Sequence, residues 1–506
     1  MALFRTRSAA VFGIEAHLID VEVDMYPGGN ARDFITVGMP DTAVRESRER
    51  IKSALLNSGF GYPNKSITIN LAPANVRKEG AGFDLPMALG ILGAMGTVGR
   101  SDEHMLVGEL SLDGTLRPVR GALSIAVCAR RQGIPNLLVP FDNAAEAAVT
   151  EGVRVFGMRH LAEVVTYLNQ PDRFQPTPSS AASSATSEEP LSDFRDVRGQ
   201  TSAKRALEVA AAGGHNVLLI GPPGSGKTML AKRFPGILPP LTFQEAIETT
   251  QIHSVAGILP RGVGLLGRRP FRSPHHTVSD AGLIGGGSGT PRPGEVSLAH
   301  NGVLFLDELP EFPRNVLEML RQPLEESSVT LARTNMTLSF PSDFILIGAM
   351  NPCPCGYFSD PTRECRCTGA IIQRYLSKVS GPLLDRIDLH VEVPAVAYKE
   401  LRGKDHGATS AEMGARVELA RAIQRRRGFY NARIPARLLR TFCTLDEAGE
   451  RTLEMAVRRM GLSARAHDRI LKAARTIADL DHAEAISAKH LAEAVQYRSL
   501  DRSYWS

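Results

Sequence analysis

The sequence lacks any long hydrophobic run and contains little cysteine. In 506 residues no apolar stretch approaches the roughly 18 residues that a membrane-spanning helix needs. Charged residues also interrupt the N-terminus before the core of a signal peptide could form, at Arg5, Arg7 and Glu15. Six cysteines are too few for a disulfide scaffold. We therefore expect a cytoplasmic protein without membrane contact, whose thiols are free or bind metal.

The sequence also lacks a strong excess of one charge, with 59 basic against 54 acidic residues. This total is too small to identify a nucleic-acid binder. The excess lies at the C-terminal end, where Ala411–Ser506 holds 18 basic and 12 acidic residues. Several arginines there recur at helical spacing, which predicts either phosphate contacts with DNA or a solvated helix face: Arg416, Arg421, Arg425, Arg426, Arg427, Arg433, Arg437 and Arg440.

What is present is an ordinary globular composition, 43% hydrophobic and 22% charged. At roughly 150 residues per domain the length predicts about three domains. Residues 170–192 are rich in proline and serine and predict a flexible linker. We expect the fold class α/β, with an α/β domain over residues 1–169, a second α/β domain over residues 193–395 and a helical domain over residues 396–506.

In the first domain, strand-like and helical patterns alternate. The expected strands are Ala16–Val23, Phe34–Val37, Ser66–Leu71, Leu106–Leu112 and Asn136–Val139. The expected helices are Thr42–Asn57, Asp84–Met95 and Ala122–Gln132.

A phosphate-binding loop follows the hydrophobic run Val217–Ile220 and precedes a helical pattern. Its residues are Gly221, Pro222, Pro223, Gly224, Ser225, Gly226, Lys227 and Thr228. Glycines let backbone N–H groups face phosphate oxygens, the lysine neutralises phosphate charge, and the threonine hydroxyl can bind Mg²⁺. Strand, loop and helix together predict ATP binding.

Two later strands end in polar residues that suit the same chemistry. Val303–Leu306 leads into Asp307, which can hold Mg²⁺, and Glu308, which can polarise the attacking water. The alternative is an ordinary solvated strand end. Phe344–Met350 leads into Asn351, whose amide could orient that water.

Four of the six cysteines fall within one polar segment, at Cys353, Cys355, Cys365 and Cys367. Four thiolates can satisfy a tetrahedral Zn²⁺ ion. The two C-x-C pairs therefore predict zinc, with reduced loop thiols as the alternative.

Several motifs together resemble the magnesium-chelatase-like AAA+ ATPases, and most closely the ComM/YifB group of bacterial competence proteins. They are Val197–Gln200, Ala211–Asn216, the phosphate loop, Ser297–Gly302 and Asn351–Gly356. The resemblance implies that Asn351 is sensor 1, Arg386 the arginine finger that reaches a neighbouring subunit, and Arg465 sensor 2. It also implies a hexameric ring.

The resemblance further implies that Ser327–Phe340 forms a hairpin in the ring pore. Pro274–Thr277 with Gly285–Gly289 would form a second pore insertion, or else an ordinary surface loop. The N-terminal third resembles the Lon-protease-like domain. Because Gly82 and Leu123 stand where a Lon enzyme has its serine and lysine, we expect no peptidase activity.

The function implied by this resemblance is that of an ATP-driven DNA motor. Its cofactors would be ATP and Mg²⁺, with Zn²⁺ at the cysteines. Single-stranded and branched DNA would be its partners, and recombination proteins are further candidates. The motor would promote branch migration during natural transformation. The alternatives are a chelatase-type ATPase that drives metal insertion through a partner subunit, and a protein-remodelling ATPase.

Overall fold

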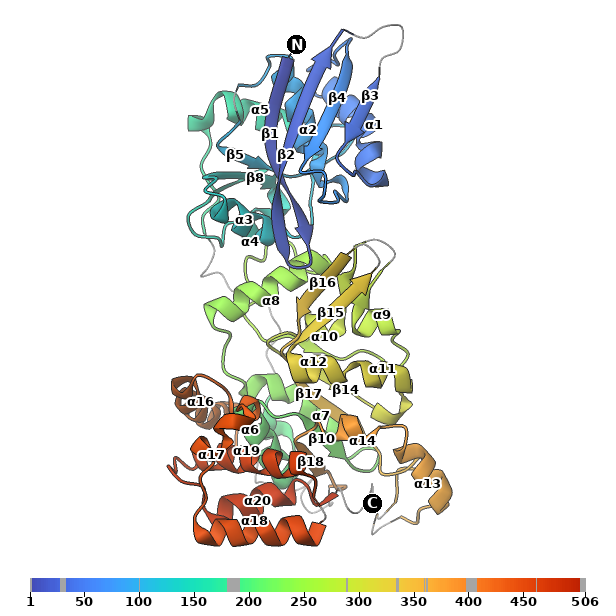
Figure 1. Ribbon diagram of the computed structural model, residues 1–506, viewed down its shortest axis with the longest axis vertical. Helices are drawn as coiled ribbons and strands as arrows, with labels where there is room; N and C mark the ends of the chain where they lie inside the picture. Colours follow the sequence, from blue (N-terminus) through green and yellow to red (C-terminus); the bar gives the residue numbers. More distant parts are fainter. Residues whose placement is uncertain are drawn as a thin grey trace.

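A computed structural model describes residues 2–27, 33–99, 101–179, 192–287, 290–333, 336–358, 360, 363–396, 407–460 and 462–500. The N-terminal domain lies at one end of the molecule, and the C-terminal helices lie beside a second sheet at the other end (Figure 1). Both sheets are covered by helices, which confirms the expected α/β class.

The N-terminal domain is built on a seven-stranded mixed sheet with the order β3-β4-β2-β1-β5-β8-β9. At its centre, β1 (Ala2–Phe12) and β2 (Glu15–Tyr26) form a long antiparallel hairpin. Buried residues alternate along β2, as a sheet with one face on the core requires. The other strands are β3 (Phe34–Val37), β4 (Ser66–Ala72), β5 (His104–Leu106), β8 (Asn136–Pro140) and β9 (Arg154–Met158).

The three helices expected in this domain are confirmed to within one residue. They are α1 (Thr42–Asn57), α2 (Asp84–Ala94) and α3 (Ala122–Arg131). Helix α2 packs directly on the central hairpin because its glycines permit close approach. A Cβ on Gly90 would lie 2.5 Å from Val23 Cγ2, and one on Gly93 would lie 2.4 Å from the Phe4 ring. Two shorter helices, α4 (Ala144–Ala147) and α5 (Leu161–Asn169), complete the domain.

One expected strand of this domain is wrong, and two strands of the seven-stranded sheet, β1 and β9, were missed. Leu106–Leu112 is divided between β5 and β6 (Glu109–Leu110), which pairs with β7 (Leu116–Arg117). The break occurs because Gly108 bonds through its backbone to Gly82 and Leu85 instead of continuing the sheet. Of the two missed strands, β1 has a buried face that carries polar residues and therefore gives little hydrophobic signal.

The expected flexible linker is wrong in its first part. The Phe174 ring packs edge-on against Tyr167 at 5.5 Å, and the Thr177 N–H donates to the Val155 carbonyl at 2.7 Å. This segment therefore covers the β9 edge of the sheet. Residues 180–191 lie outside the described part of the chain.

The second domain contains a five-stranded parallel sheet with the order β11-β14-β17-β10-β18. Its strands are β11 (Phe271–Arg272), β14 (Val303–Leu306), β17 (Ile345–Met350), β10 (Val217–Ile220) and β18 (Leu389–Glu392). The central strands β10, β14 and β17 are buried at every residue, which explains their unbroken hydrophobic sequences. Because the strands are parallel, the polar residues that follow them meet at one edge.

Helices cover this sheet on both faces. Those of the second domain are α6 (Thr201–Gly213), α7 (Lys227–Arg233), α8 (Phe243–Ala256), α9 (Asp280–Leu283), α10 (Glu295–Leu298), α11 (Arg314–Met319), α12 (Arg321–Glu326), α13 (Gly369–Leu376) and α14 (Gly381–Leu384). Those of the C-terminal domain are α16 (Ser410–Arg427), α17 (Leu439–Phe442), α18 (Glu447–Met460), α19 (Ala464–Leu480) and α20 (Ala488–Gln496).

The C-terminal helices share a hydrophobic core with the parallel sheet. One continuous cluster of buried residues includes Leu219 on β10, Leu207 on α6, Val417 on α16 and Ala474 on α19. The C-terminal domain is therefore packed against the parallel sheet through α6. In the described part of the chain we find no helix whose length and apolar character would let it span a bilayer.

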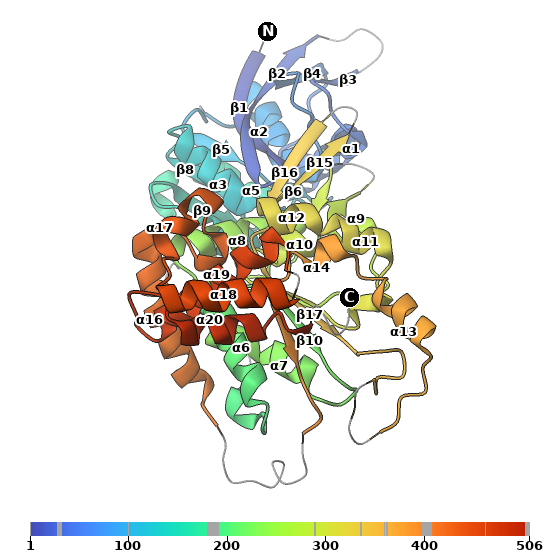
Figure 2. The ribbon, with the colours of Figure 1, turned by 60° about the horizontal axis from the view of Figure 1, so that its bottom comes forward.

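The N-terminal domain rests on α8 of the second domain, as both views show (Figures 1 and 2). Leu123, Val149, Ala246 and Leu265 form a small hydrophobic core between the two domains. The Gly121 N–H donates to Ser254 Oγ at 3.0 Å. These contacts combine apolar burial with a directional hydrogen bond.

The expected hairpin is confirmed. β15 (Ser328–Arg333) and β16 (Met336–Pro341) pair antiparallel, from Ser328 with Pro341 to Arg333 with Met336. Residues 334 and 335 at its tip lie outside the described part of the chain. The hairpin lies on the side of the second domain that faces the N-terminal domain (Figure 1).

Candidate nucleotide-binding site

The phosphate loop Gly221–Gly226 connects β10 to the first turn of α7. Gly224 and Gly226 have φ values of +77° and +94°, a region where a side chain would be strained. The loop therefore needs glycine at both positions. Lys227 begins α7, and its Nζ donates to the Gly221 carbonyl at 2.7 Å and to the Pro222 carbonyl at 2.9 Å.

Polar residues from three parallel strands meet at this loop. Lys227 Nζ also donates to Asn351 Oδ1, at the end of β17, at 3.1 Å. Thr228 Oγ1 donates to Asp307 Oδ2, at the end of β14, at 2.7 Å. Burial lowers the pKa of the Lys227 ammonium to about 8, although Asp307 favours the charged form. The lysine is thus a partly desolvated cation, suited to binding polyphosphate.

The paired Thr228 hydroxyl and Asp307 carboxylate are hard oxygen donors, which suit Mg²⁺. When bound with ATP, Mg²⁺ would neutralise charge on the β- and γ-phosphates. The described loop, lysine, hydroxyl and carboxylate therefore fit a magnesium-nucleotide.

Glu308 follows Asp307 in a left-handed backbone conformation, with φ +52°. Its N–H donates to Asp307 Oδ1 at 2.9 Å, and its side chain remains 59% exposed. One carboxylate oxygen lies 3.4 Å from His276 Nδ1. Glu308 therefore has the exposure that a group acting on a water molecule needs.

Sequence reasoning missed two residues that support this site. His276 was assigned only to an insertion, yet it lies beside Glu308. Gln200 donates from Nε2 to the Ser225 carbonyl at 3.1 Å and to the Pro394 carbonyl at 2.6 Å, and so connects the phosphate loop to the end of β18. The sequence feature that could have identified Gln200 is the Gly199-Gln200 pair directly before α6. Both residues have a left-handed backbone conformation.

The segment suggested as a second insertion lies beside the hairpin. β12 (Gly285–Gly286) pairs with β13 (Arg292–Pro293), and a Cβ on Gly285 would lie 3.2 Å from Leu331 on β15. The Thr290 hydroxyl and N–H both donate to Glu79 of the N-terminal domain. Residues 288 and 289 lie outside the described part of the chain.

Arg386 and Arg465 line a separate cavity of about 320 Å³. Arg386 is 6% exposed, and its guanidinium bonds to Glu325 and to the Pro382 carbonyl. Arg465 lies in the first turn of α19, which is capped by the Ser463 side chain. The described residues that line the cavity include no member of the phosphate loop. The structure thus places both arginines together, apart from the lysine on the same chain.

One of the residues that line this arginine cavity is a buried acid, Asp388. Asp388 receives the Asn216 N–H at 3.0 Å and an ion pair from Arg469. Burial opposes its charged form, but Arg469 and His215 hold the pKa of Asp388 below its usual range. The ionised Asp388 therefore anchors α19, which carries Arg465, to the start of β18.

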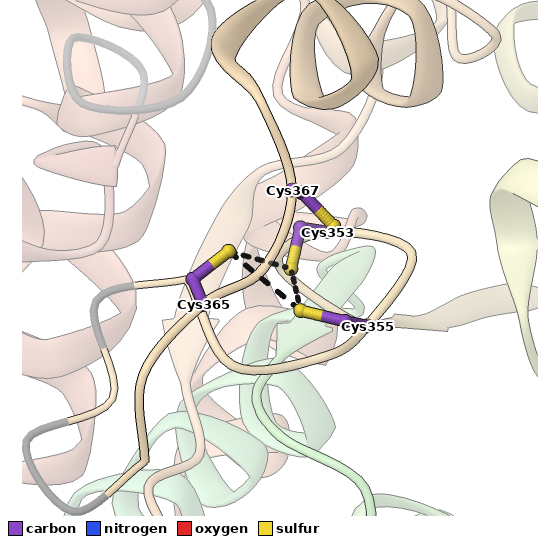
Figure 3. A group of neighbouring side chains, drawn as sticks. All are labelled: Cys353, Cys355, Cys365 and Cys367. Carbon is purple, nitrogen blue, oxygen red and sulfur yellow. Dashed lines mark hydrogen bonds between the residues drawn. The ribbon is translucent and has the colours of Figure 1, made fainter.

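The four clustered cysteines converge on one point between β17 and α13 (Figure 3). Cys353 Sγ lies 3.3 Å from Cys355 Sγ and 3.7 Å from Cys365 Sγ, and all four sulfurs lie within 4.8 Å of one another. Sulfurs bound at about 2.3 Å around a tetrahedral zinc ion would be about 3.8 Å apart. The donor set and its spacing therefore fit zinc. The other two cysteines, Cys128 and Cys443, are buried in hydrophobic surroundings.

Two of the C-terminal arginines for which DNA contact was expected are held within the fold, Arg421 and Arg427. Arg421 is 5% exposed, donates to the Ala211 carbonyl at 2.9 Å and lies over the Tyr430 ring. Arg427 forms two 2.8 Å hydrogen bonds with Asp479. Arg416, Arg425 and Arg433 pair with Glu208, Glu418 and Asp343. Arg421 and Arg427 therefore join elements of the fold. DNA contact stays a prediction for the exposed arginines, which are Arg416, Arg425, Arg426, Arg437 and Arg440.

The segment with Gly82 lines a cavity of about 800 Å³ between the N-terminal domain and the second domain. A Cβ on Gly82 would meet Val107 at 3.4 Å and Val119 at 3.7 Å. The described lining residues include no serine, cysteine or lysine. Leu123 is fully buried between the domains instead. Absence of peptidase activity stays a prediction.

Three family descriptions match successive parts of the chain. Residues 21–143 match "Subunit ChlI of Mg-chelatase", residues 193–401 match "Magnesium chelatase, subunit ChlI", and residues 407–498 match "Magnesium chelatase, subunit ChlI C-terminal". These matches cover the N-terminal domain, the phosphate-loop domain and the C-terminal helices in turn.

Individual relatives extend the similarity to nearly the full chain. Uncharacterized protein YifB of Salmonella typhimurium is 44% identical over 99% of this chain and 98% of its own length. Competence protein ComM of Haemophilus influenzae is 43% identical, also over 99% of this chain and 98% of its own length. Lon protease 2 of Bacillus subtilis is 30% identical over 33% of this chain and 35% of its own length. With these matches over nearly its full length, the protein belongs to the ComM/YifB family of magnesium-chelatase-like AAA+ ATPases.

Proposed function

We propose that the protein is an ATP-driven ring motor, a hexamer, that acts on single-stranded and branched DNA and promotes branch migration. The observation that carries this proposal is that the residues suited to nucleotide hydrolysis lie in two separate places on one chain. Thr228 bonds to Asp307 and Lys227 bonds to Asn351 at one place, whereas Arg386 and Arg465 line another cavity. An arginine that stabilises phosphate charge must reach the nucleotide. A second copy of the chain, placed next to the first, would bring the two halves together.

Within that shared site each residue has a role that follows from its chemistry. Lys227 neutralises phosphate charge, and Asn351, already bonded to Lys227, orients the attacking water. Glu308 polarises that water, because its carboxylate is exposed beside the phosphate loop. Arg386 and Arg465 of the neighbouring chain stabilise the charge that develops during transfer.

DNA is proposed as the substrate because two elements suit a central pore. The β15–β16 hairpin and the adjacent β12–β13 pair project from the same side of the ATPase domain. The relative named Competence protein ComM supports a role in DNA uptake or recombination. Recombination proteins are proposed as further partners, and zinc as the ion held by the four cysteines.

The decisive experiment is the ATPase rate of the full chain alone and with single-stranded, duplex or forked DNA. We expect stimulation that is largest with forked DNA. A variant that tests DNA contact replaces the exposed Arg426, Arg437 and Arg440 by alanine. Each lost phosphate contact should reduce the slope of log DNA affinity against log salt concentration by roughly 0.7 to 0.9. A rate that no DNA changes would contradict the DNA motor.

The family matches favour a second candidate, an ATPase that drives metal insertion through a partner subunit. Stimulation by a tetrapyrrole together with such a partner, without any response to DNA, would support this function instead. A protein-remodelling ATPase would respond to neither.

A further inference from the structure

The segment that follows β17 contacts the phosphate loop twice. Asn351 accepts a hydrogen bond from Lys227 at 3.1 Å. Five residues later, Gly356 packs so closely on the loop that a Cβ there would lie 2.4 Å from Pro223 Cδ. Gly356 also has φ +86°, so glycine is required both for the turn and for the contact. Residues 351–356 therefore support one side of the phosphate loop.

Two of the four clustered cysteines lie between these two contacts. Cys353 is fully buried, and its carbonyl accepts the Gly356 N–H at 3.0 Å, which closes the turn. Cys355 Sγ lies 3.6 Å from Cys365 Sγ, across the loop. The position of Gly356 against Pro223 is thus set by the same turn that carries the first cysteine pair.

The compact arrangement of four thiols depends on what they bind. Thiolates are like charges, which repel one another unless a cation lies between them. A soft divalent ion would hold the second pair, Cys365 and Cys367, against the first, and so hold the turn in place. Without the ion, the sulfurs separate and the turn loses one of its supports.

We infer that a divalent metal ion bound by the four cysteines holds the phosphate loop in its ATP-binding conformation, so that ATP affinity depends on occupancy of this cysteine cluster. This inference rests on the proposed nucleotide-binding function. Because coupling between two sites is reciprocal, ATP should also raise the metal affinity by the same factor. Coupling between distinct sites is typically about 5- to 150-fold.

The test uses the full chain in excess Mg²⁺. Metal content is measured by elemental analysis, and ATP affinity is measured with a fluorescent ATP analogue, before and after a zinc-selective chelator. We expect ATP affinity to fall at least about fivefold after chelation and to return when Zn²⁺ alone or Co²⁺ alone is added. The visible spectrum of bound Co²⁺ would report tetrahedral thiolate coordination.

Two variants separate the metal site from its contact with the loop. Cys365→Ser with Cys367→Ser should lose both metal and ATP affinity. Gly356→Ala should lose ATP affinity even in excess Zn²⁺, because its methyl group displaces Pro223. Glu364→Gln, an exposed change in the same loop, is the control that should alter neither. If the double cysteine variant does not fold, the chelation and Gly356→Ala experiments still decide the question.

Failure of the proposed nucleotide function and failure of this inference would give different results. No ATP binding by the metal-loaded protein would contradict the proposed nucleotide function itself. Equal ATP affinity with and without metal, no uptake of Zn²⁺ or Co²⁺, or normal ATP affinity in Gly356→Ala would overturn this inference and leave the proposed function standing.

Discussion

The two α/β domains of this protein differ in what their clefts contain. The phosphate loop is surrounded by side chains that bond to one another across three strands, including Lys227, Thr228, Asp307 and Asn351. The cavity at Gly82 is large, about 800 Å³, but its described lining offers no nucleophilic serine or cysteine and no lysine. A nucleotide site is therefore identified by convergent polar chemistry, and cavity size alone identifies no function.

The largest expected effect lies on the arginine side of the nucleotide site. Arg386→Ala should lower the ATPase kcat by about 10³-fold or more, because such an arginine stabilises charge only in the transition state. ATP binding should stay near normal, since Glu325, its ion-pair partner, is half exposed and can be solvated. Single-turnover hydrolysis and nucleotide binding check this expectation.

Two controls accompany this prediction. Arg374→Ala, an exposed arginine on α13, should leave kcat unchanged. Mixtures of Arg386→Ala and Lys227→Ala chains should regain some activity, because an intact phosphate loop then meets an intact arginine. A normal kcat in Arg386→Ala would contradict its proposed role.

The next effect concerns the carboxylate side of the same site. Glu308→Gln should retain ATP but slow hydrolysis about 10²- to 10⁴-fold, because an amide cannot polarise the attacking water as a carboxylate does. Lys227→Ala should instead lose ATP binding. Binding and turnover measured on both variants distinguish the two roles, and wild-type turnover in Glu308→Gln would exclude it as the acting acid.

A smaller effect follows from the buried lysine. Lys227 has its pKa lowered to about 8 by burial, and bound polyphosphate favours its charged form. ATP binding should therefore take up a proton above pH 8, and the Kd for ATP should rise about twofold from pH 7 to 8 and about fivefold more from pH 8 to 9. Titration calorimetry in buffers of different ionisation enthalpy measures this uptake. A flat Kd over this range would show that the ammonium persists.

The smallest effect is expected for a change in the cavity at Gly82, between the N-terminal domain and the second domain. Gly82→Ser should fit, since its Cβ meets only Val107 at 3.4 Å and Val119 at 3.7 Å. We expect less than about a twofold change in ATPase rate and no peptidase activity, because the described lining of this cavity offers no lysine to activate the hydroxyl. Fluorogenic peptide hydrolysis tests this, and any activity would mean that the cleft retains a base.

The strands of the second domain were predicted from sequence more completely than those of the N-terminal domain, for a physical reason. The strands of the parallel sheet are buried on both faces, so their hydrophobic runs and the polar residues after them were recognisable. β1 was missed because its buried face carries Thr6 and Ser8, whose signal is not hydrophobic. Leu106–Leu112 was misjudged because the contact of Gly108 with Gly82 is long-range.

Local sequence by itself determined the phosphate loop, the two acids, Asn351 and the four cysteines, because each depends on neighbouring residues in the chain. Tertiary structure alone decided which charges remain available. Arg427 meets Asp479 and Arg421 meets the Ala211 carbonyl only after distant helices pack, and this pairing removes both from any external role. The same packing placed Arg386 beside Arg465 and Gly356 against Pro223. The spacing of arginines along the chain shows that they could bind phosphate. Their distant partners in the fold decide whether each guanidinium is available to do so.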